Sequence, residues 1–197
     1  MENLDQIGRE ISACTDCALS RNRNRAVPGE GPSDADFVLV GEAPGFNEDQ
    51  QGRPFVGAAG RLLEELLSHA GLSRGQVFIT NTVKCRPLNN RDPLPGEMAA
   101  CRKYLDRQLE VISPKVVVTL GRYSLASFLP GEAIGKARGR PRNVNGTIVY
   151  PIYHPAAALR QQALRKVIEE DMQKLPELLK AAPQPQEGPQ EEQLSMF

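Results

Sequence analysis

Short apolar runs rich in β-branched residues recur along the chain and predict buried strands. The runs DFVLVG (36–41), VFIT (77–80) and KVVVTLG (115–121) are each too short for a typical globular helix. A fourth strand is predicted within TIVYPIYHP (147–155), a run that ends at a proline. We expect these four strands to form the centre of the fold.

Apolar side chains between these runs recur at helical spacing. Residues 61–71 place leucines on one helical face and end at Gly71, a suitable C-cap. Residues 95–112 show the same periodicity, residues 122–129 predict a short helix, and residues 160–181 predict a longer one. Because strands and helices alternate, the sequence predicts an α/β fold: a three-layer α/β/α sandwich with a central, mostly parallel four-stranded sheet.

Polar or glycine-rich segments follow three of the predicted strands. The segment GEAPGFNEDQQGRPFVGAAG (41–60) follows the first strand, Asn81 follows the second, and His154 follows the fourth. Ligands of open α/β sheets bind beyond the carboxyl ends of the parallel strands. We therefore expect these three regions to share one cleft, where small residues let the main chain approach a ligand closely.

Four cysteines are candidate metal ligands: Cys14, Cys17, Cys85 and Cys101. The first two form a C-x-x-C pair, which is uncommon by chance and favours a four-thiolate metal site over four buried free thiols. Disulfides are disfavoured in a chain without secretion signals. The spacing alone leaves both zinc and a [4Fe–4S] cluster open. We expect such a site to be mainly structural, because it would tie the N-terminal segment to the rest of the domain.

Composition and charge narrow the classes of function. The chain has 197 residues, of which 40% are apolar and 24% charged, as is normal for a globular protein. It has no run near the roughly 18 apolar residues of a membrane span, and it opens with the polar segment MENLDQIGRE. We therefore expect no membrane association, no signal peptide and a cytoplasmic location.

The formal net charge of +0 argues against a general nucleic-acid coat. Two basic clusters suit either solvated loops or phosphate contacts: Arg21, Arg23 and Arg25, and Lys136, Arg138, Arg140 and Arg142.

The end of the chain differs in composition from the rest. From Ala182 the sequence reads APQPQEGPQEEQLSMF, in which Pro, Gln, Glu and Gly dominate. Such a composition is typical of disorder. We therefore expect one domain over residues 1–181 and a disordered tail over residues 182–197.

Three segments together resemble the motifs of the uracil-DNA glycosylase superfamily, and specifically its family four, the bacterial and archaeal iron–sulfur enzymes. They are the segment 41–60, TNTVKCRP (80–87) and HPAAALR (154–160). The resemblance covers about residues 1–180, and the four cysteines match the family's [4Fe–4S] ligand pattern. Family five lacks an acid at the second position of the first motif, where this chain has Glu42.

The resemblance implies an activity. It predicts a monofunctional DNA glycosylase that flips uracil out of single- or double-stranded DNA and hydrolyses its N-glycosidic bond, leaving an abasic site for base excision repair. A monomer located at the nucleoid is expected. Two alternatives stay open: a non-catalytic iron–sulfur module that binds DNA or a clamp, and a glycosylase of broader base specificity. A superfamily branch that captures DNA covalently has an inserted basic, His-containing loop, which CRPLNNRDPLPGE (85–97) lacks.

The resemblance also assigns residues to the base. Phe55 is expected to stack on the flipped uracil, and Asn81 to read its O4 and N3–H edge. Cytosine presents the opposite pattern there, so it would leave buried groups unpaired. Glu48 is expected to exclude the methyl group of thymine, and the main chain at Gly41 and Ala43 to lie against the base.

Two residues are candidates for the chemistry. His154 would hydrogen-bond the uracil O2 as negative charge develops, and Glu42 would deprotonate or position the attacking water. Family one of the superfamily has an Asp at the position of Ala43, and its absence here leaves the identity of the base open. Phe46 and His69 are taken as ordinary packing and surface residues. The expected DNA contacts are Gly57, Ala58, Arg138, Arg140 and Arg160.

The last five residues, QLSMF, resemble the short peptide by which bacterial repair and replication proteins bind the sliding clamp. The expected clamp contacts are Gln193, Leu194, Met196 and Phe197. A tether of this kind would raise the concentration of the enzyme at DNA.

Overall fold

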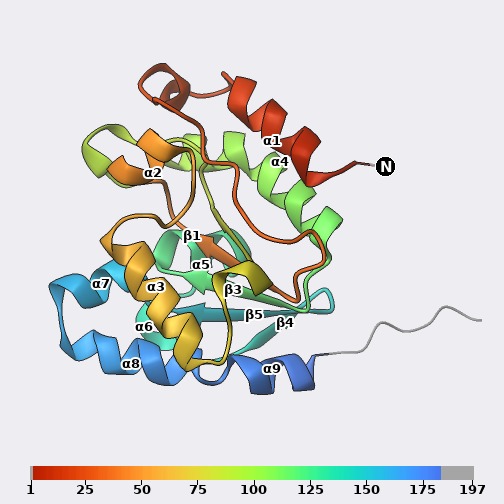
Figure 1. Ribbon diagram of the computed structural model, residues 1–197, viewed down its shortest axis with the longest axis vertical. Coiled ribbons are helices and arrows are strands. Elements are labelled where there is room, and N and C mark those ends of the chain that lie inside the picture. The colour runs from red at the N-terminus through yellow and green to blue at the C-terminus, as the bar shows by residue number, and fades with distance from the viewer. Residues whose placement is uncertain (1, 183–197) are drawn as a thin grey trace, which may run out of the picture.

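The computed structural model describes residues 2–182 and contains a central five-stranded sheet (Figure 1). The strands are β1 (Phe37–Gly41), β2 (Val77–Asn81), β3 (Val116–Leu120), β4 (Arg142–Val144) and β5 (Thr147–Ile152). Their order in the sheet is β2-β1-β3-β5-β4. β1, β2, β3 and β5 run parallel, which confirms the predicted α/β class and the mostly parallel sheet.

The prediction of four strands missed β4, which pairs antiparallel with β5 at the edge of the sheet. β4 is only three residues long and largely polar, so it carries no apolar periodicity, and its residues were expected to form a basic loop. A tight turn at Asn145 and Gly146, with φ values of 51° and 88°, joins β4 to β5. Asn-Gly between two strands is a strong hairpin signal, and it marks this hairpin in the sequence.

The helices fill the connections between the strands. They are α1 (Leu4–Ala13), α2 (Phe46–Gln51), α3 (Ala58–His69), α4 (Pro95–Ile112), α5 (Arg122–Phe128), α6 (Ile134–Ala137), α7 (Pro155–Arg160), α8 (Ala163–Met172) and α9 (Leu175–Ala181), with three short 3₁₀ turns, η1 (Ala18–Arg21), η2 (Arg74–Gln76) and η3 (Leu88–Asn90). α3 ends before Gly71, whose φ is 72°, as the C-cap prediction requires. The single helix predicted over 160–181 is divided, because Pro176 lacks an amide hydrogen and is accommodated in the first turn of α9.

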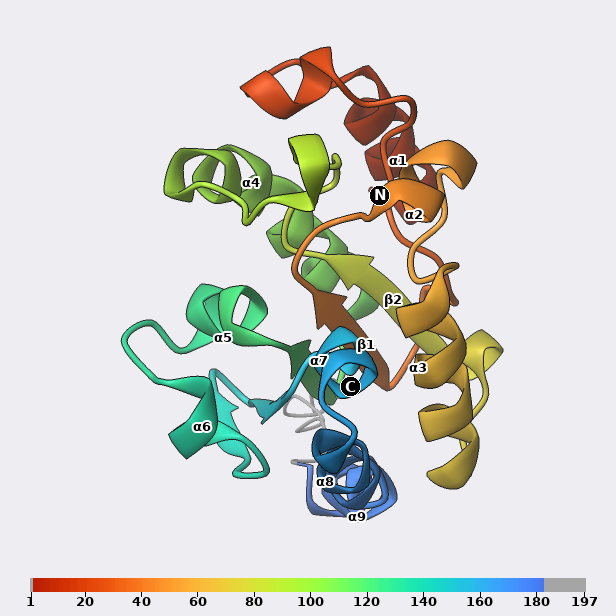
Figure 2. The same ribbon diagram turned by 90° about the vertical axis from the view of Figure 1, so that its left-hand side faces the viewer.

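Strand residues alternate between two cores. Phe37 and Leu39 pack with residues of α3, α8 and α9, whereas Val38 and Val40 pack with residues of α4. Figure 2 shows α4 and α3 on opposite sides of β1 and β2. This confirms the predicted three layers. A smaller core, which includes Ile7 of α1 and two cysteines, lies where α1 packs against α4 (Figure 1).

Across residues 2–182, no helix combines the length and the apolar composition that crossing a membrane would require.

Candidate active site

The carboxyl ends of the parallel strands meet at one cavity. β1 ends at Gly41 and β2 at Asn81, and these two residues are paired in the sheet. His154 follows the end of β5 and is the N-cap of α7. Asn81 and His154 line a cavity of about 180 Å³ together with Phe55 and Glu48. Pockets for drug-sized ligands are roughly 300–1,000 Å³, so this smaller volume suits a single flat ring.

Asn81 presents an unpaired amide oxygen in this cavity. The residue is 1% exposed, and its Oδ1 atom has no hydrogen-bond partner among the described residues. A buried polar atom without a partner costs about 1–3 kcal/mol, and a ligand that donates a hydrogen bond would remove that cost. Gly41 permits the geometry, because a Cβ atom at this position would lie 2.3 Å from the Asn81 Oδ1 atom and 2.7 Å from the ring of Phe55.

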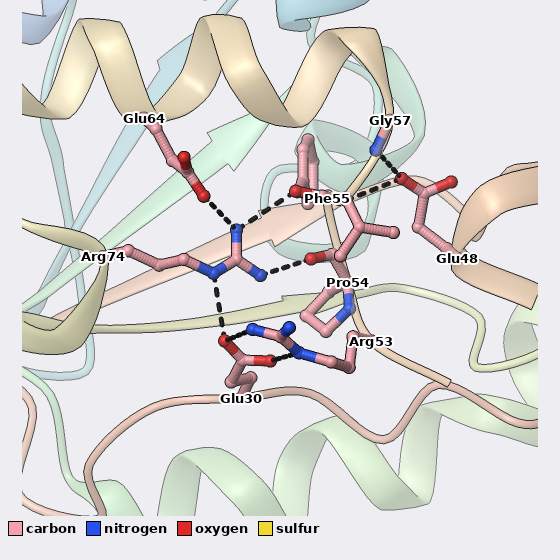
Figure 3. Close-up of polar contacts among 9 residues, drawn as sticks. Glu30, Glu48, Arg53, Pro54, Phe55, Gly57, Glu64 and Arg74 are labelled. Atoms are coloured by element: carbon pink, nitrogen blue, oxygen red, sulfur yellow. Dashed lines mark hydrogen bonds and ion pairs between the residues drawn. The ribbon is translucent and has the colours of Figure 1, made fainter. Parts of the chain in front are cut away.

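Phe55 presents its ring from a strained main chain. Its φ of 51° lies in the left-handed region, where a residue other than glycine costs about 1–3 kcal/mol and persists only when its surroundings enforce it. The ring stacks on the imidazole of His154, with 5.5 Å between centroids and 23° between planes. Glu48 Oε1 accepts hydrogen bonds of 2.9 Å from the N–H groups of Val56 and Gly57. Glu48 therefore holds the segment that carries Phe55, besides lining the cavity (Figure 3).

His154 offers an N–H donor without a charge. Its Nδ1 atom accepts a hydrogen bond of 3.1 Å from the Ala156 N–H, so the proton of the neutral ring lies on Nε2. The residue is half-buried, and desolvation of its ring lowers the pKa of His154 to about 4, against the opposing field of Glu48. At pH 7 the imidazole is therefore neutral, with Nε2–H free to donate.

Glu42 directly follows β1, and its side chain reaches the N-terminal end of α5. Its Oε1 atom accepts a hydrogen bond of 3.1 Å from the Tyr123 N–H. Burial raises the pKa of Glu42, although this hydrogen bond opposes the shift. Gly121, with a φ of 96°, makes room for the carboxylate, because a Cβ atom there would lie 2.4 Å from Glu42 Oε1. The carboxylate is thus fixed and partly desolvated, which suits a base.

A wider cleft of about 330 Å³ adjoins the cavity and shares Ala43 and His154 with it. Glu42 lines this cleft. It is also lined by three arginines: Arg91, Arg122 and Arg160. Guanidinium groups beside a ring-sized cavity suit the phosphates of a nucleic-acid strand whose base enters that cavity.

The four cysteines come from separate parts of the chain but lie together in space. Cys14 and Cys17 follow α1, Cys85 follows β2, and Cys101 lies within α4, yet all four line one small cavity. Burial raises the pKa of Cys101 to about 11, so an uncoordinated thiol would stay protonated at neutral pH.

Hydrogen-bond donors already point at two of these sulfur atoms. Arg23 donates to Cys85 Sγ at 3.0 Å, and the main-chain N–H of Lys84 donates to Cys101 Sγ at 3.3 Å. Such donors stabilise thiolates. The donor set and its surroundings therefore fit a thiolate-bound metal centre.

A family model described as the uracil DNA glycosylase superfamily matches residues 28–175. The chain belongs to the uracil-DNA glycosylase superfamily.

This superfamily member is similar to several curated proteins over most of its length. It is 50% identical to the "Type-4 uracil-DNA glycosylase" of Saccharolobus solfataricus, across 93% of this chain and 89% of that protein. It is 45% identical to the protein of the same name in Thermotoga maritima, across 91% of this chain and 96% of that protein. The "Type-5 uracil-DNA glycosylase" of Thermus thermophilus is 37% identical over 57% of this chain and 58% of that protein. These matches confirm the predicted resemblance to family four.

The structure gathers some of the predicted DNA contacts and separates others. Arg160 lines the cleft, and Gly57 and Ala58 begin α3 beside the segment that carries Phe55. Arg138 instead forms an ion pair of 2.6 Å with the buried Asp171. Arg140 is exposed, and neither Arg138 nor Arg140 lines the cavity or the cleft. The predicted clamp contacts Gln193, Leu194, Met196 and Phe197 lie outside the described residues.

The sequence did not indicate three residues near the site: Arg91 and Arg122, which line the cleft, and Gly121, which makes room for the Glu42 carboxylate. A signal for Gly121 and Arg122 was present, because Gly121 ends the third predicted strand and Arg122 directly follows it, at the same edge of the sheet as Gly41 and Asn81. Arg91 carries no such signal, because it lies in a polar loop.

Proposed function

We propose that this chain is a monofunctional uracil-DNA glycosylase, which flips uracil out of DNA and hydrolyses its N-glycosidic bond, leaving an abasic site. The observation that carries the proposal is the ring-sized cavity in which Phe55, Asn81 and His154 meet. These residues offer an aromatic face, an amide edge and an uncharged N–H group to one ligand. The relatives named "Type-4 uracil-DNA glycosylase", at 50% and 45% identity, support the same reaction.

Recognition of the base begins with its removal from the stack, at a cost of about a few kcal/mol. Stacking on Phe55 compensates for part of the stacking that is lost. Asn81 then accepts a hydrogen bond from the N3–H of uracil at its unpaired Oδ1 atom and donates one to O4. Cytosine has an acceptor at N3 and a donor at position 4, so it leaves these buried groups unpaired and is rejected strongly.

Glu48 is assigned to the exclusion of thymine. A loose pocket discriminates against one methyl group by only ~1–3 kcal/mol, whereas fixed atoms reject it more strongly. The carboxylate of Glu48 is held by three main-chain N–H groups, including that of Gly45 at 3.1 Å. Gly41 and Ala43 carry little or no side chain, which lets the main chain lie against the base.

The chemistry is hydrolysis of the bond between C1′ of deoxyribose and N1 of uracil. As this bond breaks, its electron pair leaves with uracil and the sugar becomes oxocarbenium-like. His154 donates a hydrogen bond from Nε2–H to uracil O2, where the negative charge grows. Glu42 accepts a proton from water as the water oxygen bonds to C1′, and its charge also favours the cationic sugar.

The cleft supplies the DNA contacts in this proposal. Arg160 lines the cleft and the N-terminal end of α3 lies at Gly57 and Ala58. Arg91 and Arg122 also line the cleft, where they pair with Glu97 and Asp92. Phosphate contacts of this kind fix the position of the strand without reading its sequence. One chain supplies the whole site, so a monomer is sufficient.

We assign a [4Fe–4S] cluster to Cys14, Cys17, Cys85 and Cys101. The four thiols line one cavity, which suits a four-thiolate site, and the match of the four cysteines to the family-four ligand pattern favours the cluster over a single zinc ion. Its role would be to hold α1 against α4 and the segment after β2. Fresh protein should absorb in the visible region and contain about four irons and four sulfides per chain; stoichiometric zinc instead would contradict the assignment.

We assign the C-terminal tail to binding of a partner protein. The sequence QLSMF at residues 193–197 would bind the bacterial sliding clamp and retain the enzyme at the nucleoid. Deleting these residues should abolish clamp binding and leave activity on a free oligonucleotide unchanged. Equal clamp binding by the truncated protein would reject this assignment.

Cleavage of an oligonucleotide that contains one uracil, followed by alkali, tests the activity. The wild-type protein should cleave it, and His154→Ala and Asn81→Ala should each lose about 10²–10⁴ in rate. His69→Ala is the matched control, because His69 is the other histidine of the chain and lies exposed on α3. A wild-type protein that binds the DNA without cleaving it would favour the non-catalytic alternative.

A further inference from the structure

A charged network lies behind the segment that presents Phe55. Figure 3 shows Arg74, from η2, pointing at the main chain of Pro54 and Phe55. The Arg74 side chain is only 16% exposed. Glu30, Arg53 and Glu64 complete the network.

The guanidinium of Arg74 holds two successive carbonyl groups. Its Nη1 atom donates to the Phe55 carbonyl at 3.1 Å, and its Nη2 atom donates to the Pro54 carbonyl. Its Nε atom donates to Glu30 Oε1 at 3.0 Å. Three donors of one planar group are thus used in three directions, which the single ammonium group of a lysine cannot reproduce.

Glu30 connects this network to the strand that carries Asn81. Its carboxylate accepts two hydrogen bonds from Arg53, of 2.6 and 2.9 Å. Its main chain exchanges hydrogen bonds with Ile79 of β2, at 2.9 and 2.8 Å. The two arginines, Arg53 first, lower the pKa of Glu30 to about 2, so this anchor stays ionised under ordinary assay conditions.

The opposite side of the segment is held as well. Glu48 accepts hydrogen bonds from the N–H groups of the two residues after Phe55. Gly60, in the first turn of α3, lies against the Phe55 carbonyl so closely that a Cβ atom there would be 1.8 Å from the oxygen. The left-handed φ of Phe55 is therefore maintained by contacts on both sides, and Arg74 supplies those that reach its own carbonyl.

We propose that Arg74 is a positioning residue for base recognition: through the carbonyl groups of Pro54 and Phe55, it sets the position and tilt at which the aromatic ring stacks on the flipped uracil. The proposal rests on the proposed function. Arg74 acts without touching the substrate, from a short turn between α3 and β2. It connects the Phe55 main chain to β2, the strand that ends at Asn81, so that the aromatic face and the amide edge keep a fixed relative position.

The test compares Arg74→Lys with Arg53→Gln. Arg74→Lys keeps the charge and loses the fork of donors, so the inhibition constant for free uracil should rise about tenfold and kcat/KM on a single-uracil oligonucleotide should fall about tenfold. Arg53→Gln removes an ion pair of the same network, but Arg53 donates no hydrogen bond to either carbonyl. Both constants should therefore stay within about twofold of wild type. Thermal unfolding of each variant reports whether the fold is retained, and Arg74→Gln replaces the lysine variant if that one does not fold.

A double-mutant comparison separates positioning from general stabilisation. In a Phe55→Ala background the ring is gone, so Arg74→Lys should change the inhibition constant by less than about twofold. An unchanged inhibition constant in Arg74→Lys alone, or the same fold-change in both backgrounds, would overturn the proposal. A wild-type protein that neither cleaves uracil-containing DNA nor is inhibited by uracil would instead reject the proposed function, and this inference with it.

Discussion

Replacing Gly121 with alanine should damage catalysis much more than folding. Gly121 has a φ of 96° and lies between β3 and α5, where a Cβ atom would be 2.4 Å from Glu42 Oε1 and 3.2 Å from the Cβ atom of His154. Real Cβ atoms essentially never lie closer than 3.0 Å to another heavy atom. The carboxylate must therefore move by at least about 0.6 Å from the position in which it is assigned to activate water.

The magnitude follows from the two costs of this substitution. The backbone strain of alanine at such a φ is about 1–3 kcal/mol. Moving the end of a Glu side chain adds little to this, because it can rotate. A misplacement of about 1 Å in an active site costs up to 10²-fold in rate, so we expect kcat to fall about 10- to 100-fold. KM should change little, because Phe55 and Asn81 are untouched.

Gly131→Ala is the matched control for strain. Gly131 has a φ of 85°, and nothing lies within 4 Å of the Cβ atom that alanine would add. Both variants should lose similar stability in thermal or urea unfolding, while single-turnover cleavage of a uracil oligonucleotide falls only in Gly121→Ala. A Gly121→Ala enzyme that cleaves within about twofold of Gly131→Ala would refute the role given to Glu42.

Three further predictions concern other parts of the site. Gly41→Ala should raise KM about tenfold or more, because its Cβ atom would lie 2.3 Å from the Asn81 Oδ1 atom; steady-state kinetics on a single-uracil oligonucleotide would measure it. In a pH–rate profile, kcat should decline on the acid side where Glu42 gains a proton, at a pKa raised by burial. His154 should add no inflection between pH 6 and 7, because its pKa is about 4; a titration of the His154 ring itself in that range would contradict a neutral imidazole. Cys101→Ser should lose the visible absorbance and much of the thermal stability, and an unchanged spectrum would exclude this ligand.

Much of the fold could be predicted because the parallel sheet is buried on both sides. The apolar strands β1, β2, β3 and β5 stand out in the sequence for this reason. β4 could not be found from apolar pattern, because Arg142 and its neighbours are polar and lie at an edge that faces solvent on one side. The break between α8 and α9 had a signal in the sequence, because Pro176 lacks an amide hydrogen and favours the first turn of a new helix.

The site residues that could be predicted from the sequence are those that lie at the ends of strands. Gly41 and Asn81 end strands, and His154 follows one, so the topology of the sheet alone brings them together. Arg74 could not be found in this way. It contacts the main chain of Pro54 and Phe55, and hydrogen bonds to main-chain carbonyls leave no signature in the side chains that the sequence records.

The positions of Arg138 and Glu48 show how three-dimensional contacts refine a sequence assignment. Arg138 belongs to a basic cluster in sequence, but its ion pair with Asp171 ties it to α8. Glu48 was expected to face the base, and it also accepts three main-chain hydrogen bonds from the loop around the cavity. Loss of Glu48 would therefore disturb both the shape of the cavity and the position of Phe55.

A crystal structure of the protein with free uracil would show whether the cavity at the strand ends binds the base. We predict one uracil in this cavity, with its ring on the face of Phe55, its O4 and N3–H edge on the amide of Asn81, and its O2 within hydrogen-bond distance of His154 Nε2. Uracil bound elsewhere on an active enzyme, or bound in this cavity without contact to Asn81 and His154, would contradict it.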